Sequence, residues 1–66
     1  MNVNKLKGKI VEKGLNIEGL AKLIGTDRST LYRKLNASDK ITIGDAIKIK
    51  NVLELTEVEA TDIFFN

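Results

Sequence analysis

The stretch NIEGLAKLIGTDRSTLYRKLN, residues 16–36, decides which fold this sequence predicts. Apolar residues recur at the spacing of the buried face of a helix on both sides of Gly25. They are Leu20, Ala21 and Ile24 before the glycine and Leu31 and Leu35 after it. Gly25 can adopt the left-handed conformation that ends many helices, and Asp27 can cap the helix that follows. We therefore expect helices at about residues 17–24 and 28–36, joined by a very short turn, which is the arrangement of a helix-turn-helix unit.

Helix start and stop signals recur through the rest of the chain. Asn4 can cap a first helix that ends at Gly14, and Asn16 can cap the second. Further on, TIGD at residues 42–45 and TEVE at residues 56–59 each place a threonine three residues before an acid, as a capping box requires. The sequence therefore predicts five short helices and no convincing strand, with the helices at about residues 4–13, 17–24, 28–36, 43–53 and 57–65. Helices of this length are unstable alone, so we expect them to pack into one compact all-α domain spanning residues 1–66.

Two glycines do not suit this scheme. Gly8 and Gly19 fall inside the first and second predicted helices, where glycine costs about 1 kcal/mol relative to alanine. Close approach of a neighbouring helix or of a ligand would explain them, and simple tolerance is the other interpretation.

The composition excludes several classes of function. The chain has 66 residues with no cysteine and no histidine, so disulfides, zinc sites and histidine-based acid–base catalysis are not expected. The acids in the C-terminal part have no partner for acid–base catalysis, and we interpret them as capping and solvating groups. No apolar run approaches the roughly 20 residues of a membrane span, and no signal peptide is evident. We therefore expect a cytoplasmic protein that is not an enzyme, with no metal, no cofactor, no membrane contact and no small-molecule substrate.

Charge is unevenly distributed along the sequence. Residues 1–40 hold nine lysines and arginines against four acids, whereas residues 41–66 hold two lysines against five acids. Such a split within one small domain indicates that one face meets a polyanion while another does not. Chance is the alternative explanation for this feature taken alone.

Both arginines of the chain fall on the helix predicted at residues 28–36. With Leu31 and Leu35 on the buried side, a rotation of about 100° per residue turns the polar residues outward. These outward residues are Ser29, Thr30, Arg33 and Asn36, with Arg28 and Tyr32 at the edges. Guanidinium, hydroxyl and amide groups on an acid-free face are the groups that read base edges in the major groove of DNA. The alternative is an ordinary solvated face, although most such faces include glutamate.

Residues 16–36 resemble the helix-turn-helix of the lambda-repressor-like, or XRE, family, which includes phage repressors and Cro proteins. The matching features are a leucine-alanine pair, the glycine that ends the helix, a cap two residues later and an apolar residue four beyond it: Leu20, Ala21, Gly25, Asp27 and Leu31. The segment ITIGDAIKIKNVLELTEVEATDIFF, residues 41–65, resembles the fourth and fifth helices of phage repressors of this group. The resemblance implies a five-helix transcriptional regulator that binds a palindromic double-stranded DNA operator as a homodimer, with the helix at residues 28–36 in the major groove.

The resemblance also implies roles for individual side chains. The positions that contact bases in the family hold Arg28, Ser29 and Arg33, with Thr30 or Tyr32 as further candidates. The positions that anchor the DNA backbone hold Asn16, Asn36 and Lys40. Many members carry glutamine or another polar residue where this chain has Ile17, and often an apolar residue where it has Lys34. The second departure would rotate the helix, so the choice between Arg28 and Thr30 as base readers stays open.

A contact between two copies of the chain is expected near the last helix. Val58 and Phe65 lie on roughly the side of that helix opposite its apolar stripe of Ala60, Ile63 and Phe64. Exposed apolar residues at a frayed terminus are the alternative explanation. We take Leu55, Val58 and Phe65 as candidates for the dimer interface.

Two other functions fit the same sequence. One is the DNA-binding antitoxin of a toxin–antitoxin pair, and the other is a protein-interaction module that keeps the fold without binding DNA. A DNA-binding protein should lose affinity steeply with salt, whereas an interaction module should bind DNA little at any salt concentration.

The run of Lys5, Lys7 and Lys9 is either a solvated face or a surface beside DNA.

Overall fold

The computed structural model describes residues 1–37 and 40–65, and these residues form five α-helices and no strand. The helices are α1 (Val3–Glu12), α2 (Ile17–Ile24), α3 (Arg28–Asn36), α4 (Ile43–Leu53) and α5 (Glu57–Phe64). The all-α fold expected from the sequence is therefore confirmed. The observed helix ends differ from the expected ones by no more than about one residue, which is within the uncertainty of any assignment of helix ends.

The capping residues explain where most of these helices begin and end. The Asn16 side chain accepts a hydrogen bond from the Gly19 N–H at 2.7 Å, and Gly25 ends α2 in the left-handed conformation with φ of 84°. Both predicted capping boxes form, at Thr42 in α4 and at Thr56 in α5. Sequence signals of this kind thus set where the short helices begin and end, while packing between helices keeps them folded.

Two of the expected caps are wrong or incomplete. The N-cap of α1 is Asn2 rather than Asn4, because the Asn2 side chain accepts a hydrogen bond from the Lys5 N–H at 3.1 Å and the helix starts at Val3. Asp27 does occupy the N-cap position of α3, but its side chain makes no capping hydrogen bond.

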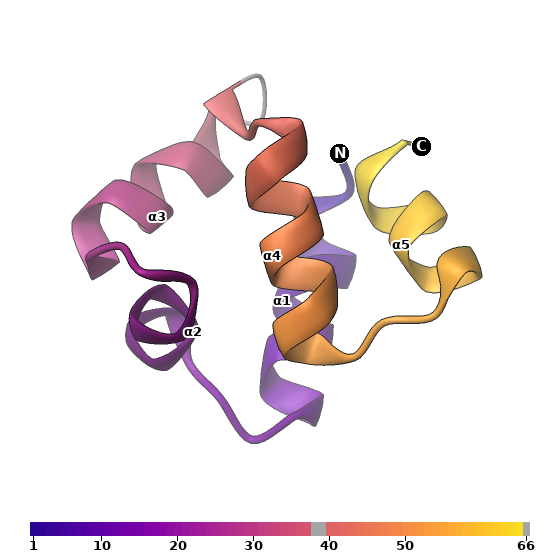
Figure 1. The fold of residues 1–66 in the computed structure, drawn as a ribbon, viewed down its shortest axis with the longest axis horizontal. Helices are drawn as coiled ribbons and strands as arrows, with labels where there is room; N and C mark the ends of the chain where they lie inside the picture. The colour runs from indigo at the N-terminus through magenta and orange to yellow at the C-terminus, as the bar shows by residue number, and fades with distance from the viewer. Residues whose placement is uncertain (38–39, 66) are drawn as a thin grey trace.

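Figure 1 shows α4 in front of α1, with α2 and α3 on one side of this pair and α5 on the other. α2 packs against α3 and α4, and α1 packs against α5. The Asn2 N–H donates to the Ile63 carbonyl at 2.7 Å, which ties the start of the chain to α5. No described helix combines the length and the apolar character needed to cross a membrane.

One hydrophobic core holds the five helices together. The buried residues are Leu6, Ile10, Leu20, Ala21, Leu31, Leu35, Ile49, Leu53, Leu55, Ala60 and Ile63. Each buried leucine or isoleucine side chain contributes about 1.5–3 kcal/mol relative to an exposed one. α3 is fixed in the domain by two of them, because Leu31 and Leu35 are each only 1% exposed. Its opposite side is thereby turned toward solvent.

Ion pairs gather on the side of the domain that carries α5. Lys5 pairs with Asp62 at 3.3 Å, while Lys9 pairs with Glu59 and Lys50 pairs with Glu57. Two of the three N-terminal lysines, Lys5 and Lys9, therefore pair with acids of α5, while Lys5 and Lys7 remain exposed to solvent. The basic and acidic halves of the sequence are therefore not two separate faces, although the arginines of α3 and the acids of α5 do lie on opposite sides of α4 (Figure 1).

Candidate nucleic-acid interface

The outward side of α3 carries most of the residues that the sequence singled out. Arg28, Ser29, Tyr32, Arg33 and Asn36 are exposed, with Tyr32 retaining 51% of its accessible surface, whereas Thr30 is half-buried. Neither arginine is folded into the domain. This side of α3 therefore offers guanidinium, hydroxyl, phenol and amide groups to a ligand that approaches from solvent.

Two shallow hollows border this side of α3, and Arg33 lines both of them. The first is lined by Arg28, Ser29, Tyr32 and Arg33, and the second by Thr30, Arg33, Lys34, Ala37 and Lys40. The Arg33 Nε donates to the Ser29 carbonyl at 3.4 Å, so the base of its guanidinium lies along its own helix. Four of the five candidate base readers thus gather at one hollow, and Thr30 lies on the other flank together with Lys40.

The arginines of α3 differ from most lysines of the domain in whether they form ion pairs. Neither Arg28 nor Arg33 forms an ion pair with any described carboxylate, whereas five lysines do: Lys5, Lys9, Lys22, Lys34 and Lys50. Asp39, which follows the face in sequence, lies outside the described residues. Apart from the Arg33 Nε–H, which donates to the Ser29 carbonyl, the donors of these guanidinium groups are available to an external acceptor.

One carboxylate borders this face at its N-terminal edge. Asp27 is exposed, and its pKa lies below the ordinary value, chiefly because of the Thr30 hydroxyl and with a smaller effect from Arg33. Asp27 therefore stays ionised next to Arg28. The face is free of acids along α3 itself, as expected, but not at the cap that precedes it.

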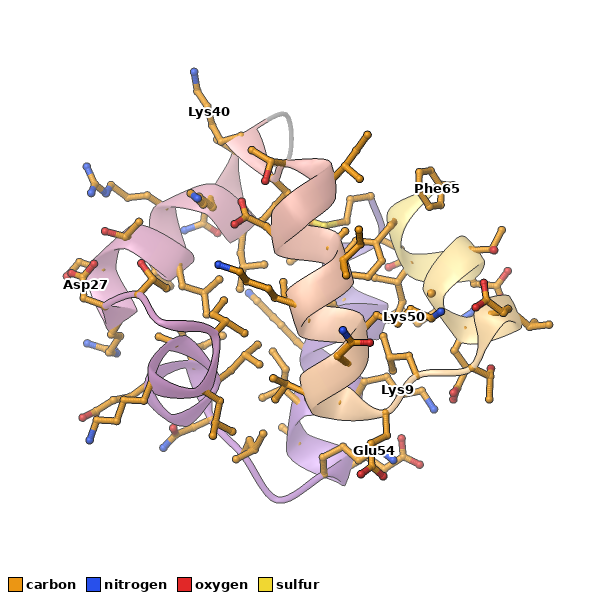
Figure 2. All side chains as sticks on the ribbon, in the orientation of Figure 1. Lys9, Asp27, Lys40, Lys50, Glu54 and Phe65 are labelled. Atoms are coloured by element: carbon orange, nitrogen blue, oxygen red, sulfur yellow. The ribbon has the colours of Figure 1, made fainter. Side chains whose placement is uncertain are left out.

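The three candidates for phosphate contact lie at two separate places. Asn36 is exposed in the last turn of α3 and Lys40 is exposed beyond its end, where Lys40 points away from the domain in Figure 2. Asn16 is exposed at the start of α2, where it borders a hollow between α1 and α2. Its side-chain oxygen caps α2, which leaves its amide nitrogen as the group that can donate to a phosphate.

Lys34 is the residue at this site whose role the sequence did not reveal. It replaces an expected apolar residue, yet its side chain is only 32% exposed and its Nζ lies 2.9 Å from the Asp45 Oδ2. The same oxygen accepts the Thr42 N–H at 3.1 Å. One signal in the sequence could have pointed to this role, because Lys34 follows Leu31 by three residues and so lies at the edge of the buried stripe. Such an edge position brings a long polar side chain against the neighbouring helix.

The dimer-interface candidates divide into two groups. Val58 and Phe65 are 71% and 75% exposed, and Phe65 points away from the helices in Figure 2. Leu55 is 6% exposed and belongs to the core of its own chain, so it is not available to a second copy in this conformation. The sequence did not single out Ile43, which is 75% exposed and borders the same hollow as Phe65.

No group of acids among the described residues is arranged to hold a metal ion. No protein-family model, curated protein or solved structure matches this chain. The geometry and chemistry of the α3 surface are therefore the guide to what the protein binds.

Proposed function

We propose that the protein is a sequence-specific, double-stranded DNA-binding transcriptional regulator of the lambda-repressor-like type, acting in the cytoplasm as a binding protein and not as an enzyme. The observation that carries the proposal is the cluster of Arg28, Ser29, Tyr32 and Arg33 at one exposed hollow of α3. Neither arginine of this cluster is paired with a described carboxylate.

The dimensions of α3 suit a major groove. An α-helix with its side chains is about 10–12 Å across and the major groove is about 12 Å wide, so the nine-residue α3 can lie in the groove. In this proposal α2 and α3 form the helix-turn-helix, with α3 in the groove and α2 above it. Arg28 and Arg33 then test for guanine O6 and N7, each bidentate contact contributing about 1–3 kcal/mol of discrimination. Ser29 and Tyr32 add a hydrogen bond or a contact with a thymine methyl group.

Phosphate contacts set the register of that helix. Asn36 ends α3, Lys40 lies just beyond it, and Asn16 lies at the start of α2. Contacts at both places would hold the helix at a defined depth and angle. The N-terminus of α2 adds partly positive backbone N–H groups beside Asn16. These contacts give affinity without sequence preference.

We also propose that two copies bind a palindromic operator. Half-sites one helical turn apart are centred about 34–36 Å from each other, and the domain measures 27 × 25 × 19 Å. Two domains on adjacent half-sites would therefore lie within side-chain reach of each other. Val58 and Phe65 are the exposed apolar residues proposed for that contact.

Titration of a random-sequence duplex at two salt concentrations tests the class of function. A protein that grips several phosphates should lose affinity steeply as salt rises, because each contact releases counterions. Lys40→Ala should reduce the slope of log affinity against log salt by about one. Absence of binding at low salt would contradict the proposal and favour a protein-interaction module.

A further inference from the structure

One ion pair joins the helix proposed to read DNA to the helix that follows it. The Lys34 Nζ, on α3, lies 2.9 Å from the Asp45 Oδ2, in the first turn of α4. Among the described residues it is the one ion pair that α3 makes. Lys34 is the neighbour of Arg33 in sequence and lines the same hollow as Arg33 and Lys40.

The Asp45 carboxylate is placed so that two elements depend on one oxygen atom. Its Oδ2 accepts the Lys34 ammonium and also the Thr42 N–H, which belongs to the capping box of α4. The Asp45 side chain is 19% exposed, less than any other carboxylate in a described ion pair. Burial raises the pKa of this carboxyl, but hydrogen bonds from Lys34 and Thr42 outweigh it, so the pKa lies below its ordinary value.

We propose that Lys34 and Asp45 are positioning residues that fix the C-terminal half of α3 against the start of α4, and with it the placement of Arg33 relative to Lys40. This inference rests on the proposed DNA-binding function. Lys34 directs its ammonium toward Asp45, and in this proposal its role is to hold the helix. The lysine that stands where the family often has an apolar residue is thereby explained by its contact with Asp45.

The direction in which one substitution changes the affinity for DNA distinguishes a positioning role of Asp45 from a purely electrostatic one. Asp45→Asn removes a negative charge beside a surface proposed to face DNA, so electrostatics alone would strengthen binding. The asparagine oxygen can still accept the Thr42 N–H, but its interaction with Lys34 is no longer charge-assisted. Positioning therefore predicts weaker binding despite the more favourable net charge. Asp45→Glu, which keeps the charge and suits a capping box, is the matched control.

The test combines duplex titration with amide hydrogen exchange on the free protein. Asp45→Asn should weaken duplex binding roughly fivefold or more, while Asp45→Glu stays close to wild type. In the absence of DNA, exchange of the Ala37 and Lys40 amides, which donate to the Arg33 and Ala37 carbonyls, should become faster in Asp45→Asn. The Ala60 amide, in α5, should keep its protection.

Equal or tighter duplex binding by Asp45→Asn, or unchanged exchange of the Ala37 and Lys40 amides, would overturn the positioning role alone. Failure of the wild-type protein to bind any duplex would instead overturn the proposed function. Thermal unfolding of both variants checks that each remains folded at the temperature of the measurements.

Discussion

Glu59 caps α5 and at the same time pairs with Lys9 of α1. Its Oε1 accepts the Thr56 N–H at 2.9 Å, while its Oε2 receives the Lys9 ammonium. Asp45 does the same for α4, with Thr42 as its capping partner and Lys34 as its lysine. In both cases the acid of a capping box also joins its helix to another one. A local sequence signal and a tertiary contact therefore depend on the same carboxylate.

The Glu59 pair gives the folded state a defined pH dependence. Hydrogen bonds from Lys9 and then from Thr56 lower the pKa of Glu59 from 4.5 to about 2. Because the folded pKa is depressed, the stabilisation is present above about pH 4.5 and is lost as the pH falls toward 2. Glu59→Gln should therefore be less stable than wild type at pH 6 and should lose less stability between about pH 5 and 2. Urea unfolding across this range measures both effects, and parallel pH profiles for the two proteins would contradict the assignment.

Gly8 offers a direct way to stabilise α1. It is exposed inside the helix, and nothing lies within 4 Å of the position that a Cβ would take, so simple tolerance explains it. Gly8→Ala should raise the free energy of unfolding by about 1 kcal/mol, which urea denaturation can resolve. Gly25→Ala is the contrasting variant and should lower stability, because φ at Gly25 is 84°. A neutral or destabilising Gly8→Ala would show that α1 is held differently from the structure described here.

Gly19 has a different explanation from Gly8. A Cβ at this position would lie 3.3 Å from the Asn16 Oδ1 and 3.5 Å from the Leu15 Cδ2, so a side chain would crowd the cap of α2. The sequence marked both glycines as anomalies, and only the structure separates them.

Much of the fold could be predicted because its signals are local. Asn16, Gly25 and the two threonine capping boxes lie next to the helix ends that they determine, and Leu31 and Leu35 carry the spacing of a buried stripe. The exposed side of α3 follows directly from that stripe.

The features that could not be predicted depend on how the chain turns between helices or on contacts between segments that are distant in sequence. Leu55 was an interface candidate because it lies at the turn between the last two helices. In the structure Glu54 turns the chain with φ of 52°, and the Leu55 N–H donates to the Lys50 carbonyl at 3.0 Å. Leu55 thereby lies in the core. Lys34 looked like an interruption because its partner, Asp45, lies 11 residues away on another helix. Sequence spacing on one helix does not report such pairings.

Two substitutions at Asn16 separate its structural role as a helix cap from its proposed phosphate contact. Asn16→Asp keeps an oxygen that can accept the Gly19 N–H and is also a good N-cap, so stability should stay near wild type. The new negative charge should nonetheless weaken duplex binding. Asn16→Ala should lose about 1 kcal/mol of stability through the lost cap. Thermal unfolding and duplex titration measure the two effects, and unchanged binding by Asn16→Asp would remove Asn16 from the proposed interface.

Phe65 tests the proposed contact between two copies. Because it is 75% exposed, Phe65→Ser should leave the stability of the single chain almost unchanged. On a duplex with two half-sites the variant should bind with reduced cooperativity, whereas its affinity for a single half-site should equal that of wild type. Electrophoretic titration of the two duplexes measures this difference. Equal cooperativity in both proteins would place the dimer contact elsewhere or argue against a dimer.

Selection of bound duplexes from a random pool, carried out in parallel for wild type, Arg33→Ala and Lys40→Ala, tests the DNA-reading role of α3 most directly. The proposal predicts that wild type enriches a palindromic sequence and that Arg33→Ala loses its preference at one base pair in each half-site. Lys40→Ala should enrich the same sequence with lower affinity throughout. Enrichment of no sequence by the wild-type protein, or an Arg33→Ala preference identical to that of wild type, would contradict the account.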